Sequence, residues 1–238
     1  MEYNDILILE FMGGITKSNF EGGEIDMKID SIIFDLDGTL WNSCSSILEI
    51  WNKILLNNYS ELNRVITIDE INGVMGLTSE KIVERLLPNV DKELGLKIFD
   101  ECAAAECEYL RVSGGVLYDK VEEILDELNK KYKLFIVSNC QCGYIEAFLE
   151  AHKLEKYFVD FENYERTGLP KGDNIRLVIE RNNLQNPIYV GDTEGDYNAT
   201  KESNIPFVYA KYGFGIVEDA KLVIESFEEL KNIVENIN

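Results

Sequence analysis

The sequence predicts an α/β fold: a doubly wound parallel sheet with a small all-helical domain inserted after the first strand. Short apolar runs alternate with helical patterns from residue 31 onward. Continuous apolar strands in such an alternation are typical of a parallel sheet that helices cover on both faces. The alternation is interrupted once, at residues 45–112, where no convincing strand occurs. We therefore expect a core domain of residues 28–44 and 113–238 and a helical cap domain of residues 45–112.

Five apolar, β-branched or aromatic runs predict the strands of the core. They occupy residues 31–35, 134–138, 188–190, 206–209 and 222–224. Apolar residues that recur every three or four positions predict helices at residues 116–131 and 172–183. The last helix is expected to begin with a capping box formed by Ser226 and Glu229. Because ligands bind beyond the carboxyl ends of parallel strands, polar residues at those ends are candidates for function.

Four helices are predicted in the inserted region. They cover residues 45–57, a segment that begins at a capping box of Thr67 and Glu70, residues 78–88 and residues 91–112. The loop at residues 71–80, with Gly73 and Gly76 around Met75, is a candidate for contact with a substrate. Trp41 and Asn42 lie at the predicted hinge and could line the same pocket.

The charge of the chain limits its partners. Its 23 Lys and Arg stand against 44 Asp and Glu, which gives a net charge of −21. Nucleic acids and anionic membrane surfaces require a basic surface, so neither is expected as a partner. The sequence also has no apolar run long enough to span a membrane. A phosphorylated substrate would be repelled at long range and would need a metal ion or a well-placed lysine.

The five cysteines favour reduced thiols and a cytoplasmic location, since their number is odd and no secretory signal precedes them. Cys140 and Cys142, or Cys102 and Cys107, could be imagined as zinc ligands together with His152. None of these pairs has the C-x2-C spacing of a structural zinc site. Small buried side chains are the preferred interpretation.

The N-terminal residues 1–27 are expected to be an extension of the core. Met27 is followed at once by the first core strand, and the codons of EGGEID can contain a purine-rich ribosome-binding sequence. Our hypothesis is that translation in the cell starts at Met27. The mass of the native protein would test this, and a mass that includes residue 1 would contradict it.

Polar residues follow three of the predicted strands. They are Asp35 and Asp37, Ser138 and Asn139, and Asp192 and Asp196. In a parallel sheet these ends meet at one edge, where the carboxylates would repel each other unless they shared a cation. Mg²⁺ fits best, because it takes oxygen ligands and is usually held by one or two carboxylates together with a phosphate.

Two simpler explanations of these aspartates compete with a magnesium site. An EF-hand calcium loop is excluded by spacing, since Leu40 stands where Gly is needed and Ser46 where Glu is needed. Taken alone, however, Asp37 or Asp196 could equally cap a helix or a turn. Lys171 is more informative, because it stands at the predicted start of a helix, where the helix dipole disfavours a cation. Such a placement indicates a nearby anion.

Together, the motifs DLDGTL, Ser138, Lys171 in LPKGDN and GDTEGD resemble those of the haloacid dehalogenase-like superfamily. The resemblance covers residues 28 to about 215 and implies a Rossmann-like core. A helical insertion directly after the first motif is similar to the group that includes phosphoglycolate-type phosphatases and sugar-phosphate mutases.

The resemblance implies a role for each motif residue. Asp35 would be the nucleophile that forms an aspartyl-phosphate, and Asp37 the general acid and base. Mg²⁺ would be held by the Asp35 carboxylate, the Asp37 main-chain carbonyl and Asp192. Asp196 would either bind the ion directly or lie next to a residue that does. The residues expected to bind or neutralise the phosphoryl group are Ser138, Asn139 and Lys171.

We therefore predict a magnesium-dependent phosphatase that acts on a small phosphorylated metabolite, as a monomer or homodimer. The acid at Asp37 favours phosphate esters over halides or phosphonates. A sugar phosphomutase is the alternative, because it would use the same pair of aspartates. A phosphate-binding protein without catalysis is less favoured, since every required polar group is present.

Overall fold

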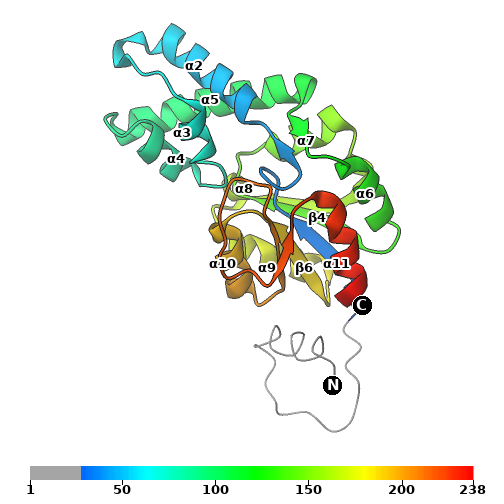
Figure 1. Cartoon of the computed structure of the whole chain (residues 1–238). Coiled ribbons are helices and arrows are strands. Elements are labelled where there is room, and N and C mark those ends of the chain that lie inside the picture. Colours follow the sequence, from blue (N-terminus) through cyan, green and yellow to red (C-terminus); the bar gives the residue numbers. More distant parts are fainter. Residues whose placement is uncertain (1–27, 238) are drawn as a thin grey trace.

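The computed structural model describes residues 28–237. At its centre lies a six-stranded sheet of order β5-β4-β1-β6-β7-β8, in which every neighbouring pair is parallel (Figure 1). The strands are β1 (Ser31–Phe34), β4 (Lys133–Ser138), β5 (Phe158–Asn163), β6 (Pro187–Gly191), β7 (Phe207–Ala210) and β8 (Leu222–Ile224). The predicted α/β fold with a parallel sheet is confirmed. The hypothesis about residues 1–27 lies outside the described residues.

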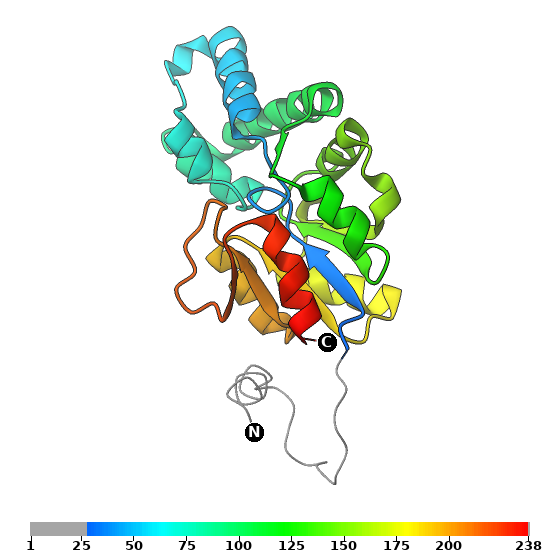
Figure 2. The same cartoon turned by 45° about the vertical axis from the view of Figure 1, so that its right-hand side comes forward.

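Helices cover both faces of the sheet because alternate strand residues point to opposite sides. In β1, Ile32 and Phe34 belong to the larger apolar core, while Ile33 belongs to the smaller one. Among the helices that flank the sheet, α6 (Val121–Leu128), α7 (Tyr144–His152) and α11 (Leu230–Ile237) contribute residues to the larger core. The helices of the smaller core are α9 (Lys171–Asn182) and α10 (Glu194–Ser203). Figure 2 shows α11, in red, in front of the sheet.

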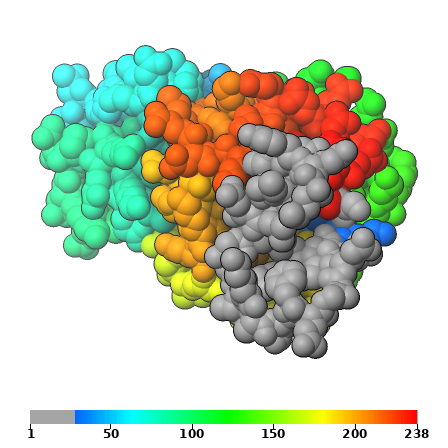
Figure 3. All heavy atoms as spheres, turned by 60° about the horizontal axis from the view of Figure 1, so that its bottom comes forward, coloured from blue at the N-terminus to red at the C-terminus, as the bar shows by residue number. Residues whose placement is uncertain are grey.

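The short strands β2 (Trp41–Asn42) and β3 (Val116–Leu117) pair antiparallel and enclose a helical segment. Its helices are α2 (Cys44–Asn58), α3 (Ile68–Asn72), α4 (Ser79–Leu86) and α5 (Lys92–Ser113). We call residues 44–113 the helical insert. It lies beyond the carboxyl end of β1 in Figure 1 and at one side of the core in Figure 3. The capping box of Thr67 and Glu70 is confirmed, whereas the division of the chain into two domains stays a prediction.

The remaining elements are short. They are the helix α8 (Tyr164–Thr167) and the 3-10 turns η2 (Ser60–Leu62), η3 (Glu155–Tyr157) and η4 (Phe227–Glu229). No helix within residues 28–237 is long and apolar enough to cross a membrane.

Three details differ from the sequence predictions. Strand β5 was not expected, because this edge strand is partly exposed and mixes acidic with apolar residues. The segment 116–131 is helical only over Val121–Leu128, since Val116 and Leu117 pair with β2. The capping box at Ser226 does not form, because the Glu229 side chain accepts from the Glu225 N–H instead.

Candidate active site

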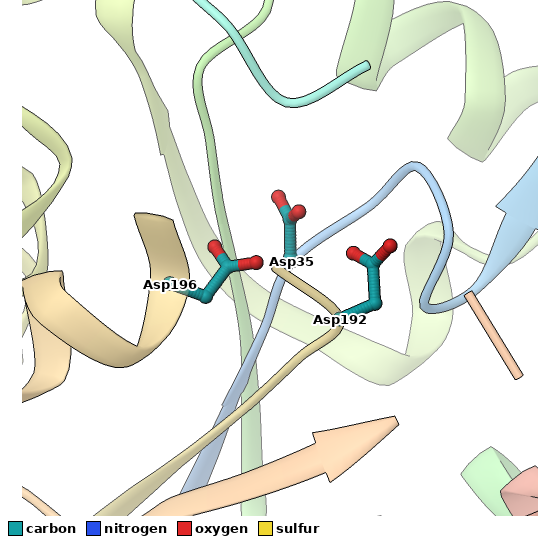
Figure 4. A group of neighbouring side chains, drawn as sticks. All are labelled: Asp35, Asp192 and Asp196. Atoms are coloured by element: carbon teal, nitrogen blue, oxygen red, sulfur yellow. The ribbon is translucent and has the colours of Figure 1, made fainter. Parts of the chain in front are cut away.

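Three aspartates come together at the carboxyl end of the sheet (Figure 4). Asp35 directly follows β1, and its N–H donates to Val190 O at 2.8 Å, which extends the pairing of β1 with β6. Asp192 directly follows β6, and Asp196 lies in the first turn of α10. All three are buried, and each offers an oxygen that lies within 4.8 Å of the others. The parallel register of neighbouring strands therefore creates the cluster.

Lys171 supplies a positive charge to this cluster. It is the first residue of α9, and its buried Nζ lies 3.0 Å from Asp35 Oδ1 and 2.5 Å from Asp196 Oδ1. Burial alone would lower the pKa of Lys171, but Asp196 and Asp35 raise it above its usual range. The ammonium thus stays charged, and the two carboxylates explain a lysine at a helix start.

Asp196 is anchored on both of its oxygens. Oδ2 accepts hydrogen bonds from the N–H and hydroxyl of Thr193, at 2.9 and 2.7 Å, in the capping box that begins α10. Oδ1 accepts from Lys171 and, at 3.3 Å, from the hydroxyl of Tyr189. Asp196 therefore does cap a helix, and it also holds Lys171 in place. The sequence analysis did not single out Thr193, although the T-x-x-D spacing within GDTEGD is a sequence signal for this capping box.

Asp35 and Asp192, by contrast, keep open oxygens. Neither oxygen of Asp35 accepts a hydrogen bond, although Oδ1 forms the ion pair with Lys171. Asp192 Oδ2 accepts from the Phe214 N–H at 2.7 Å, while its buried Oδ1 has no partner. Burial and the neighbouring carboxylate of Asp196 raise the pKa of both Asp35 and Asp192. Unpartnered carboxylate oxygens with excess negative charge fit a divalent cation.

Glycine allows the chain to pack closely around Asp192. Gly38 has φ of +80°, and a Cβ at this position would lie 2.2 Å from Asp192 Oδ2. A Cβ on Gly213 would lie 2.3 Å from the Asp192 Cβ. The glycine of the DLDGT motif is thus required both by its backbone conformation and by the space that Asp192 occupies.

The side chain of Asp37 has different surroundings. Its Oδ1 accepts hydrogen bonds from Ser43 Oγ at 2.8 Å and from the Tyr144 hydroxyl at 2.9 Å. Burial raises its pKa to about 6, although these two hydrogen bonds lower it. Two aspartates that are two positions apart in sequence therefore have separate partners. Neither Ser43 nor Tyr144 carried a sequence signal for this contact. Tyr144 is more than 100 residues from Asp37 in the sequence.

Asp37 also lines a small cavity of about 60 Å³ between the core and the helical insert. Ser138 and Asn139, which follow β4, line it too. Asn139 Nδ2 donates to Gly76 O at 2.9 Å and so links the core to the insert. The predicted loop around Met75 contributes to the wall of the cavity.

Trp41 does not line this cavity. It is fully buried, and its ring packs edge-on against those of Tyr144, Phe148 and His152. Within residues 28–237 the group of possible metal ligands contains aspartates alone. All five cysteines are free thiols.

Comparison with known proteins agrees with this geometry. The family model of the haloacid dehalogenase-like hydrolases matches residues 32–210. A phosphoglycolate phosphatase of Photobacterium profundum is 26% identical over 223 residues, which are 87% of this chain and 96% of the relative.

Among solved structures, a predicted phosphatase from Clostridium acetobutylicum has a TM-score of 0.72 at 25% identity, covering 87% of this chain and 99% of that one. A β-phosphoglucomutase from Clostridium difficile has a TM-score of 0.69 at 18% identity, covering 88% and 97%, and shares the fold. The family match spans every predicted site residue. The chain belongs to the haloacid dehalogenase-like hydrolase family, as the motifs predicted.

Proposed function

We propose that this hydrolase is a magnesium-dependent phosphatase that cleaves a small phosphate monoester through an aspartyl-phosphate on Asp35. The observation that carries the proposal is the different setting of the two DLDGT aspartates. Asp35 Oδ1 pairs with Lys171 and its Oδ2 accepts no hydrogen bond, whereas Asp37 is held by Ser43 and Tyr144 at the wall of the cavity. One carboxylate is free to attack, and the other is positioned to move a proton.

In the first step an oxygen of Asp35 forms a bond to phosphorus as the bond to the ester oxygen breaks. Asp37 gives its proton to that oxygen, which leaves as an alcohol. In the second step water attacks phosphorus and gives a proton to Asp37, while the bond to Asp35 breaks and phosphate is released. The raised pKa of Asp37, about 6, suits a group that must give and take a proton near neutral pH.

Asp35, Asp192 and the main-chain carbonyl of Asp37 would hold Mg²⁺, with Asp196 behind them. The ion would neutralise phosphoryl oxygens and the excess carboxylate charge. Lys171 would offset the charge of Asp35 and of the phosphoryl group, while Ser138 and Asn139 would bind the remaining phosphoryl oxygens. These local charges would overcome the repulsion between a chain of net charge −21 and an anionic substrate.

We further propose that the helical insert is a cap that contacts the leaving group. Its contribution to the cavity is mainly apolar, from residues such as Ile47, Val74 and Leu86. A sugar phosphate would place several hydroxyl groups against this wall, where few could form hydrogen bonds. The cavity therefore supports a phosphatase over the sugar phosphomutase, although both would use the same aspartates.

The test measures phosphate release from a panel of phosphate monoesters, with p-nitrophenyl phosphate as a general reporter, with and without Mg²⁺. We expect Mg²⁺-dependent release, and its loss in Asp35→Asn. Asp219→Asn, a change at an exposed aspartate, is the matched control and should retain activity. Magnesium-independent release, or full activity of Asp35→Asn, would contradict the proposal. An isomerised sugar phosphate without net release would favour the mutase.

A further inference from the structure

The cavity contains a buried carboxylate that the proposed reaction does not use. Glu106, on α5 of the helical insert, is 5% exposed and lines the cavity together with Asp37 and Ser138. Its Oε1 accepts a hydrogen bond from the indole N–H of Trp51, and its Oε2 accepts from Gln141 Nε2 at 2.8 Å. Both donors are neutral, so the negative charge of Glu106 has no cationic partner in these contacts.

The rest of the cavity offers no compensating charge. Among the described residues that line it, none is a lysine, arginine or histidine. Burial accordingly raises the pKa of Glu106 from 4.5 to about 7. An acid on a cavity wall without a cation is costly to the free protein, and a positive group on a ligand would remove that cost.

The neighbouring wall suits a positive group as well. The rings of Trp51, Phe99 and Tyr144 line the same cavity, and aromatic faces attract ammonium groups. A carboxylate on the leaving group, as in phosphoglycolate, would instead meet Glu106 in a space of low polarity. The phosphoryl end has Lys171, but Lys171 does not line the cavity.

We propose that the alcohol released by this enzyme carries an amine, whose ammonium group binds Glu106, and that anionic leaving groups are excluded. This inference rests on the proposed phosphatase function and specifies its substrate class. Glu106 is then a specificity-determining residue on the part of the cavity wall that α5 contributes. Its alternative role is structural, because Glu106 joins Trp51 of the insert to Gln141 of the core.

The test uses three phosphate esters of similar size and different charge at pH 8: 2-aminoethyl phosphate, propyl phosphate and phosphoglycolate. We expect kcat/KM to fall in that order, with roughly 100-fold between the cationic and the anionic ester. In Glu106→Gln, which keeps the side-chain shape, the ratio between these two esters should fall at least about 10-fold. Glu108→Gln, at an exposed position on the same helix, should leave the ratio unchanged.

The outcomes separate the two proposals. If phosphoglycolate or propyl phosphate is the best of the three substrates, the inference about the leaving group is wrong. It is also wrong if Glu106→Gln lowers turnover of all three equally, which is the result expected from a purely structural role. The phosphatase function is tested independently by p-nitrophenyl phosphate, so it survives either result. Absence of release from every ester overturns both proposals.

Discussion

Replacement of the buried Glu106 by glutamine should make protein stability less dependent on pH. The carboxyl group has a pKa of about 7 in the folded protein and 4.5 as its ordinary value. Between these two pH values the folded state binds more protons than the unfolded state. The free energy of unfolding therefore falls as pH rises through this window, and the lost stability stays lost above pH 7. Glutamine does not ionise and removes this contribution.

The size of the effect follows from the two pKa values. One pH unit of difference corresponds to about 1.4 kcal/mol, so the full displacement from 4.5 to about 7 is worth about 3 kcal/mol. Part of this loss has already occurred at pH 5. From pH 5 to pH 8 we expect the free energy of unfolding of Glu106→Gln to rise by about 2 to 3 kcal/mol relative to that of the native sequence. Because Glu106 is buried, solvent screens its charge little and the full free energy is expected.

Urea unfolding of both proteins at several pH values between 5 and 8 would measure this difference. Urea is uncharged and does not screen the carboxylate, and a constant cost of the substitution cancels from the comparison. Glu108→Gln should follow the native protein at every pH. A stability difference that stays constant over this range would contradict the prediction, because the folded-state pKa of Glu106 would then be ordinary.

Three further substitutions test the cluster and its surroundings. Lys171→Met should reduce phosphate release by at least about 100-fold and, without Mg²⁺, destabilise the protein by about 3 to 5 kcal/mol in urea, because it leaves buried carboxylates unpaired. Gly38→Ala should cost about 1 to 3 kcal/mol and raise the Mg²⁺ concentration needed for half-maximal activity, since the new Cβ would overlap Asp192. Tyr144→Phe should lower kcat about 10-fold with little change in KM, because Asp37 loses one of its two hydrogen-bond donors; an unchanged kcat would contradict the role of this contact.

Much of the fold could be predicted because its signals are local. The run from Ile32 to Phe34 is apolar, and two of the predicted site residues, Asp35 and Asp37, follow it. Strand β5 gave no such signal, because as an edge strand it needs only part of its surface to be apolar. The capping box predicted at Ser226 was also compatible with the sequence. It does not form because the Glu229 carboxylate accepts a hydrogen bond from the Glu225 N–H instead.

The sequence could predict those site residues that directly follow a strand. Register and parallel pairing bring Asp35 and Asp192 together whatever else the chain does. Residues that depend on tertiary packing could not be found in this way. Glu106 lies in an ordinary helical sequence, and only the packing of Trp51 and Gln141 around it makes it a buried carboxylate. The same holds for Tyr144, whose hydroxyl reaches Asp37 from α7.

The strand ends and the cavity wall at Glu106 differ in how their negative charge is compensated, and this has a consequence for selectivity. At the strand ends Lys171 partly compensates the three aspartates, and a bound cation would compensate the remaining charge. Glu106, by contrast, accepts its two hydrogen bonds from the neutral side chains of Trp51 and Gln141. In the proposed reaction the strand ends recognise the phosphoryl group that all phosphate esters share, so they would not discriminate among esters. Under the proposal for Glu106, selectivity would come from the cavity wall, where one buried charge would separate leaving groups by their sign.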